Sequence, residues 1–107
     1  MLYGSSESQT VEFSLARLYL KDKAEISPEG ALMMAKFCER LRELGLTKMH
    51  LRISGSDAVL SAQRAMVLTT ALEKALVLVP GSVEHDHVPP GKRGEIAVFW
   101  LKIGGGK

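Results

Sequence analysis

Hydrophobic residues recur along this chain with two periods, one typical of strands and one typical of helices. Residues 11–20 (VEFSLARLYL) alternate and then shift phase, which predicts a strand with a bulge or bend near Ala16 and Arg17. Residues 48–54 (KMHLRIS) alternate without interruption and predict a half-buried strand. Residues 95–103 (EIAVFWLKI) are almost continuously apolar, as expected of a central strand or of one buried on both faces.

Residues 26–45 predict the clearest helix of the chain. Ser27 can cap its first turn, Pro28 fits its first position, and Gly45 fits a left-handed stop. Its apolar side chains recur at helical spacing and form one stripe, made of Ala31, Met34, Phe37, Cys38, Leu41 and Leu44. The charged residues between them are therefore expected on a solvated face, and the lone cysteine is expected to be a buried free thiol.

A second helix is predicted from about Asp57 to Leu76, and Asp57 is a natural N-cap for it. Its apolar stripe consists of Ala58, Ala62, Ala65, Leu68, Leu72 and Leu76. Arg64 lies away from this stripe. Periodicity therefore favours an ordinary solvated arginine on the flank of a core helix.

Residues 83–88 (VEHDHV) predict a weak strand, and residues 89–92 (PPGK) a turn before the last strand. The order of elements is therefore β-α-β-α-β-β. Two helices cover only one face of a four-stranded sheet, so we expect an α/β (α+β) fold, a two-layer sandwich with a mixed sheet. A right-handed crossover would make the first two strands parallel. The domain is expected to span residues 11–103, between a flexible leader at 1–10 and a flexible tail at 104–107.

Composition excludes several classes of function. The chain has 107 residues, which fits one domain, and its formal net charge of +2 is too small to indicate a polyanionic partner. One cysteine cannot form an internal disulfide. The sequence contains no nucleophile elbow, phosphate-binding loop, zinc-protease motif or dinucleotide-binding glycine pattern, so we expect neither an enzyme nor a cofactor. No apolar stretch approaches the roughly 18 residues of a membrane span.

The three histidines raise the question of a metal site. His85 and His87 lie on the same face of a predicted strand, with Asp86 opposite, and His50 of another strand could supply a third ligand. Nothing in the sequence brings His50 close to the other two. We therefore expect an exposed polar edge strand and no metal.

Three short stretches resemble a known family. Residues 18–30 (LYLKDKAEISPEG) run from an apolar strand into a Pro-Glu-Gly helix start, residues 60–72 (LSAQRAMVLTTAL) contain L-S-x-x-R-A, and residues 91–101 (GKRGEIAVFWL) form a closing strand. In this order they resemble the OmpA-like domain, the peptidoglycan-binding module of outer-membrane and flagellar-motor anchoring proteins. The resemblance covers roughly residues 18–101. It implies a non-catalytic binding or scaffold domain in the bacterial cell envelope or periplasm.

The resemblance also implies a ligand site. In the family, the arginine of this helix pairs with a carboxylate of the peptidoglycan stem peptide, and this position is Arg64. The family's G-x-T-D segment supplies an aspartate for the ligand's ammonium group, followed by a loop of about ten residues. Here the sequence passes from strand to helix almost directly, so Asp57 either replaces that aspartate or only caps the helix. In the second case the pocket is lost, and the domain is a scaffold that contacts envelope proteins.

A nucleic-acid-binding domain is the alternative. Residues 45–65 also resemble the strand, glycine and helix of Alba-like proteins, and the whole chain is similar to Smr domains and to the C-terminal domain of translation initiation factor three. Under this interpretation Arg52, Arg64, Lys92 and Arg93 contact phosphates, and the protein is cytoplasmic. The charge needed for it is small, since 14 basic residues face 12 acidic ones.

A third interpretation is a protein–protein interaction module. Phe99 and Trp100 point to opposite faces of the last strand, so one of them can lie on the uncovered side of the sheet. An exposed tryptophan there would favour a homo-oligomer or docking into a larger assembly.

Overall fold

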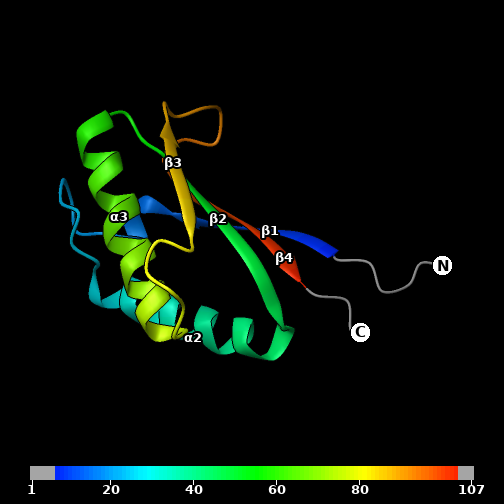
Figure 1. The fold of residues 1–107 in the computed structure, drawn as a ribbon. Helices are drawn as coiled ribbons and strands as arrows, with labels where there is room; N and C mark the ends of the chain where they lie inside the picture. Colours follow the sequence, from blue (N-terminus) through cyan, green and yellow to red (C-terminus); the bar gives the residue numbers. More distant parts are fainter. Residues whose placement is uncertain (1–6, 104–107) are drawn as a thin grey trace.

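The structure, a computed structural model, describes residues 7–103 of the chain. Its elements are β1 (Glu7–Ser14), α1 (Leu15–Leu18), α2 (Pro28–Leu44), β2 (Leu46–Ser54), α3 (Ala58–Ala75), β3 (Glu84–Val88) and β4 (Ile96–Ile103). Apart from the single turn α1, this is the predicted order β-α-β-α-β-β (Figure 1).

The four strands form one mixed sheet in the order β1-β4-β2-β3. β4 pairs antiparallel with both β1 and β2, while β2 and β3 run parallel. β1 and β2 therefore point the same way, as the crossover rule predicted, but β4 lies between them. The most apolar stretch of the sequence is thus a central strand, because it is hydrogen-bonded along both edges.

Helices α2 and α3 cover one face of this sheet and leave the other face open (Figure 1), which confirms the predicted two-layer sandwich. The core lies between the layers and consists mainly of Met34, Phe37, Cys38, Leu41, Met49, Leu51, Ile53, Ala65, Leu68, Leu72, Ala97, Phe99 and Leu101. Within residues 7–103, none of the helices has the length together with the hydropathy that crossing a bilayer requires.

The ends of α2 confirm the signals in the sequence. The Ser27 side chain accepts a hydrogen bond from the Gly30 amide at 2.9 Å, Pro28 opens the helix, and Gly45 ends it with a left-handed φ of 70°. Cys38 is buried as predicted, and burial raises the pKa of its thiol while the nearby charge of Arg42 lowers it.

Both predicted bounds of the first strand, residues 11 and 20, are wrong. Strand β1 begins at Glu7, so residues 7–10, which we expected in a leader, pair with β4. It ends at Ser14, where the expected bulge is instead the helical turn α1. The phase shift in the sequence has a simple cause, because Leu15 and Leu18 are one helical turn apart and both are buried. Residues 1–6 and 104–107 lie outside the described part of the chain.

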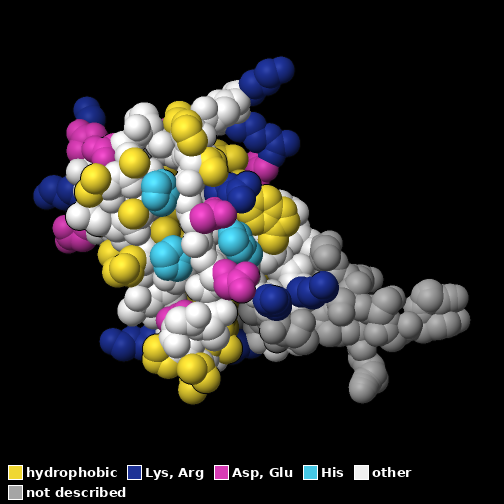
Figure 2. All heavy atoms as spheres, turned by 45° about the horizontal axis from the view of Figure 1, so that its top comes forward, with side chains coloured by type: hydrophobic (Ala, Val, Ile, Leu, Met, Phe, Trp, Pro, Cys, Tyr) yellow, Lys and Arg dark blue, Asp and Glu magenta, His cyan; other side chains and the backbone are white. Residues whose placement is uncertain are grey.

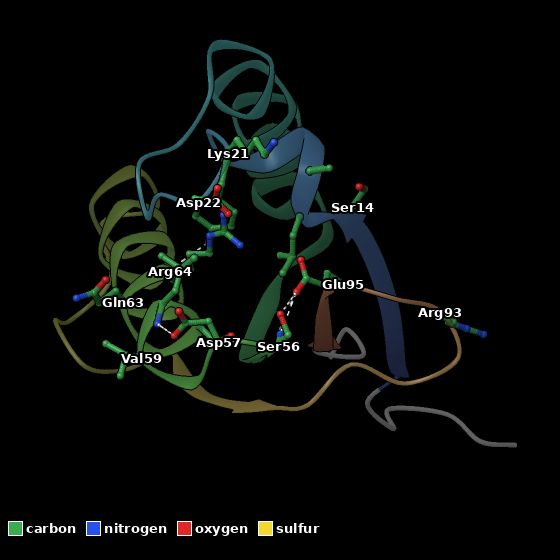
Figure 3. Close-up of a pocket in the computed structure, with 16 residues that line it drawn as sticks. Ser14, Lys21, Asp22, Ser56, Asp57, Val59, Gln63, Arg64, Arg93 and Glu95 are labelled. Atoms are coloured by element: carbon green, nitrogen blue, oxygen red, sulfur yellow. Dashed lines mark hydrogen bonds between the residues drawn. The ribbon is translucent and has the colours of Figure 1, made fainter.

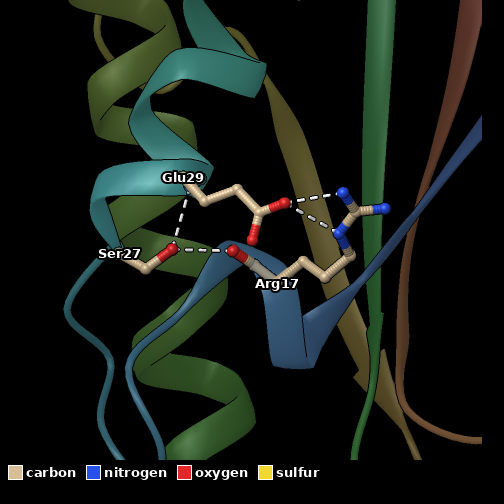
Figure 4. A network of polar contacts seen from close by, with 4 residues as sticks. Arg17, Ser27 and Glu29 are labelled. Carbon is tan, nitrogen blue, oxygen red and sulfur yellow. Dashed lines mark hydrogen bonds and ion pairs between the residues drawn. The ribbon is translucent and has the colours of Figure 1, made fainter.

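The Pro-Glu-Gly start of α2 packs tightly against α1. A Cβ atom on Gly30 would lie 2.2 Å from the Leu18 carbonyl oxygen, so only glycine permits this approach. The Arg17 side chain donates to the Glu29 carboxylate at 2.9 and 2.6 Å, and the Ser27 hydroxyl donates to the Arg17 carbonyl at 2.7 Å (Figure 4). These contacts fix the loop between β1 and α2, which forms one wall of the candidate site.

Candidate functional site

An open groove of about 1180 Å³ runs between the β1–α2 loop, the first turns of α3 and the start of β4. Its charged lining residues are Lys21, Asp22, Asp57, Arg64, Arg93 and Glu95. Figure 3 shows Lys21 and Asp22 on one side of Arg64, and Asp57 and Ser56 on the other. The volume exceeds the roughly 300–1,000 Å³ of a typical small-molecule pocket, which suits a ligand that the protein only partly encloses.

The connection from β2 to α3 is as short as the sequence indicated. β2 ends at Ser54 and α3 begins at Ala58, so no long loop overhangs the groove here. Gly55 lies in this connection, and a Cβ atom on it would lie 2.4 Å from the Ser61 hydroxyl oxygen, so a side chain here would require that hydroxyl to turn away. The groove therefore stays open on this side.

Asp57 caps α3, as predicted. Its Oδ1 accepts a hydrogen bond from the Leu60 amide at 3.0 Å. Asp57 also lines the groove, and Figure 3 shows its carboxylate beside this helix start. It precedes Arg64 by seven residues, so the two side chains lie on the same side of the helix, about 10 Å apart along its axis.

Arg64 is not the solvated flank residue that periodicity favoured. It is 7% exposed and lies at the base of the groove. Its Nε donates to the Lys23 carbonyl at 2.8 Å, and its Nη2 donates to the Leu20 carbonyl at 3.3 Å. The guanidinium carbon lies 4.9 Å from the centre of the Tyr19 ring.

The β1–α2 loop explains why helical periodicity misplaced Arg64. Periodicity describes only contacts with the sheet, whereas this loop folds over α3 and covers a side of the helix that would otherwise face water. Tyr19 contributes to the same cover, since it is 2% exposed and its hydroxyl donates to the Arg64 carbonyl at 2.8 Å. The sequence contains no local signal for this long-range contact.

Sequence reasoning also missed Glu95. Its Oε2 accepts hydrogen bonds from the amide and the hydroxyl of Ser56, each at 2.9 Å, which ties the start of β4 to the start of α3 (Figure 3). These two bonds from Ser56 lower the pKa of Glu95, against desolvation, and the positive charge of Arg64 lowers it further. Glu95 is therefore a carboxylate near neutral pH.

The lining of the groove combines both signs of charge at close range. Three of the lining side chains are cationic and three are anionic. Arg93 forms an ion pair with Glu12, so Lys21 and Arg64 are the other two cations of the lining, and Arg64 is the one that is nearly buried at its base. Such a lining suits a ligand that carries a carboxylate and an ammonium group together.

The residues of the nucleic-acid alternative do not form one surface. Arg52 lies on the open face of the sheet and donates to both oxygens of Asp86 at 2.9 Å, whereas Arg64 lies on the helix side. Lys92 and Arg93 lie on the turn before β4, where Arg93 is paired with Glu12. Phosphate binding requires a concentrated basic face, which this arrangement does not provide.

The histidines lie on two faces of the sheet. In the register of β2 and β3, His50 pairs with Glu84, while His85 and His87 pair with residues whose side chains point into the core. His50 therefore cannot join His85 and His87 at one metal ion. Over residues 7–103, no three histidine, cysteine, aspartate or glutamate side chains are grouped so that they could hold one.

The open face of the sheet has a polar network around one tryptophan. Trp100 is 40% exposed, whereas Phe99 is fully buried, as their opposite directions predicted. The guanidinium of Arg52 lies 5.2 Å from the Trp100 ring centre, and the His50 ring lies 5.8 Å away. The His50 nitrogens lie 3.6 Å from Glu84 and 3.3 Å from Asp86. Figure 2 shows histidine, acidic and basic side chains gathered together on this side, beside hydrophobic atoms.

Comparisons with known proteins identify the fold. No family model and no curated protein matches the sequence. Among solved structures, the cell wall anchor of the T6SS from Pseudomonas aeruginosa aligns with a TM-score of 0.73 at 13% identity, over 90% of this chain and 82% of that one. The OmpA-like domain of FopA1 from Francisella tularensis aligns with 0.68 at 14%, over 97% and 78%. The periplasmic domain of Helicobacter pylori MotB aligns with 0.67 at 12%, over 88% and 76%.

These likenesses define a class of fold. The chain, with its mixed four-stranded sheet in the order β1-β4-β2-β3, aligns with each of these structures over most of the length of both chains. The chain has the OmpA-like fold, as the resemblance of its three short stretches indicated.

Proposed function

We propose that this protein is a non-catalytic binding module of the bacterial cell envelope and that its groove binds the stem peptide of peptidoglycan. The OmpA-like fold supports the compartment, since the aligned structures include a periplasmic domain and a cell wall anchor. The observation that carries the proposal is the position of Arg64, a nearly buried guanidinium at the base of an open groove. A guanidinium in this setting can grip a carboxylate through parallel hydrogen bonds.

Asp57 is the proposed partner of the ligand's ammonium group. Its Oδ1 accepts the bond from the Leu60 amide, and its Oδ2 is the oxygen that we assign to the ligand. Long side chains in a helix lean toward its N-terminus, which is the end of α3 where Asp57 lies. Capping the helix and binding a ligand are therefore compatible roles for this carboxylate.

Amide NMR titration with soluble peptidoglycan stem fragments tests the proposal. We expect shifts at Asp57 and Arg64 and, in a separate assay, co-sedimentation with purified cell-wall sacculi. Asp57→Asn retains a side-chain oxygen for the cap but removes the charge, so it should weaken binding and leave the fold intact. Gln63→Ala changes an exposed neighbour in the same groove and serves as the matched control.

Two results would contradict the proposal. One is that neither the stem fragments nor the sacculi bind. The other is a set of salt-sensitive shifts at Arg52, Lys92 and Arg93 on addition of short RNA or DNA, which would support the nucleic-acid alternative instead.

For the open face of the sheet we propose contact with an envelope protein or with a second copy of this chain. Trp100 supports this, because an exposed indole in a polar surround is typical of protein interfaces. Light scattering of the wild type and of Trp100→Ser measures whether this face forms a homo-oligomer. A wild-type monomer would leave a different envelope protein as the partner to be sought.

A further inference from the structure

The hydrogen bonds of Arg64 decide which edge of its guanidinium can meet a ligand. Nε and Nη2 donate to the carbonyls of Lys23 and Leu20 at 2.8 and 3.3 Å. These two nitrogens form the side edge of the guanidinium, one of the edges that can grip a carboxylate through parallel bonds. The loop backbone already occupies this edge, so the end edge, formed by Nη1 and the second N–H of Nη2, is the one left for the groove.

Tyr19 contacts Arg64 at two points, with its ring at the guanidinium and its hydroxyl at the backbone carbonyl. Its ring lies 4.9 Å from the Arg64 guanidinium carbon, and its hydroxyl donates to the Arg64 carbonyl at 2.8 Å. Both contacts are shielded from water, since Tyr19 is 2% exposed, and a low dielectric strengthens them. Burial raises the pKa of Tyr19 above its ordinary value, although the charge of Arg64 opposes this, and the hydroxyl stays protonated as a donor.

The loop that receives these bonds is itself closed by backbone hydrogen bonds. The Leu20 amide donates to the Glu25 carbonyl at 2.9 Å, and the Lys23 amide donates to the Leu20 carbonyl at 3.1 Å. Tyr19 and Ile26 form an isolated bridge across its base. Arg64 therefore binds a small closed loop, and any movement of its guanidinium must move this loop as well.

We propose that Tyr19 is a positioning residue that holds Arg64 end-on to the groove, so that a ligand carboxylate meets the Nη1–Nη2 edge. This inference rests on the proposed function, because that function supplies the carboxylate. It also couples binding to the order of the β1–α2 loop. A ligand that restrains Arg64 restrains residues 20–25 through the same two carbonyls.

Tyr19→Phe tests the proposal, because it keeps the ring beside the guanidinium and removes the hydroxyl. We expect soluble stem fragments to bind this variant about three- to tenfold more weakly, as the loss of one buried hydrogen bond allows. We also expect the Arg64 Nε–H proton to exchange with water faster than in the wild type. Added stem fragment should slow amide exchange over residues 20–25 in the wild type more than in the variant.

Phe37→Leu is the matched control, since Phe37 belongs to the core beneath α2 and does not line the groove. It should reduce stability and leave both the binding of stem fragments and the exchange of the Arg64 Nε–H unchanged. Wild-type binding in Tyr19→Phe would overturn the inference, and so would an equal loss of binding in Phe37→Leu.

If the wild type binds no stem fragment, the proposed function fails. The exchange rate of the Arg64 Nε–H then still tests whether Tyr19 positions the guanidinium. Faster exchange in Tyr19→Phe supports this positioning role, and an unchanged rate overturns it.

Discussion

Glu95 and Ser56 connect the start of β4 with the start of α3 through a single carboxylate oxygen. Glu95 lies in the closing-strand stretch of residues 91–101, but the family resemblance gave neither residue a role, and each lies in a short connection between elements. Their contact orients the turn that carries Asp57, so an exposed pair of polar residues helps to shape one end of the groove. At the residue scale, the candidate site depends on such contacts between segments far apart in the sequence.

The Glu95–Ser56 contact predicts a specific pH dependence. Because the folded protein lowers the pKa of Glu95, this group stabilises the fold at pH values above its unfolded pKa, and the contribution is lost as the pH falls through the lowered folded pKa. In Ser56→Ala one of the two donors is removed, so we expect the pKa of Glu95 to move back toward its ordinary value. An NMR titration of the Glu95 side-chain carboxyl measures this. An identical titration curve in wild type and variant would show that the hydroxyl contributes nothing.

At the scale of elements, the junction of α1 and α2 is closely packed, backbone against backbone. α1 exists because its two leucines pack into the core one turn apart, and α2 begins directly against its backbone. The Arg17–Glu29 ion pair closes the junction from outside, but it is exposed and contributes little to stability. The close backbone contact at Gly30 determines the position of the loop that holds Arg64.

Gly30→Ala should therefore destabilise the protein. The added methyl group meets backbone atoms of Leu18 that cannot rotate away, so we expect the free energy of unfolding to fall by about 1–3 kcal/mol or more. Gly91→Ala is the control, because the added Cβ atom would meet no atom within 4 Å, and a change within about 0.5 kcal/mol is expected. Chemical denaturation of both variants provides the measurement. Equal stability of the two would mean that α2 can shift away from α1 without cost.

At the scale of the whole molecule, one core joins both layers. Leu68 of α3 is fully buried in the same cluster as residues of α2, β2 and β4, so helices and sheet should unfold together. Trp100, the one tryptophan of the sequence, lies on the far side of the sheet and is a natural fluorescence probe for it.

We expect Leu68→Ala to lower the free energy of unfolding by about 2–5 kcal/mol. Both far-UV circular dichroism, which follows the helices, and Trp100 fluorescence, which follows the sheet, should shift by the same amount. Val67→Ala, at the neighbouring but 39% exposed position, should change stability far less. Separate midpoints for the two signals would show that the layers unfold independently.

Local patterns of the sequence determined most of the fold. The caps Ser27 and Asp57, the stop at Gly45 and the alternation in β2 each report contacts within a few residues, and all of them are found in the structure. The two-layer architecture followed from counting helices against strands. The same reasoning failed between Leu15 and Leu18, because a strand with a phase shift and a strand followed by one helical turn have the same pattern of hydrophobic residues.

The burial and the contacts of the candidate site residues were decided only by the tertiary structure. The sequence placed Arg64 on α3 and, through its family resemblance, marked it as a ligand residue, but only the folded chain decided that it is buried and which of its edges is occupied. Glu73 is a second example, since it is nearly buried on the same helix and accepts hydrogen bonds from the amides of Gly81 and Val83. Periodicity records how a helix meets the sheet. It contains no information about loops that return from distant parts of the chain, and in this protein those loops build the groove.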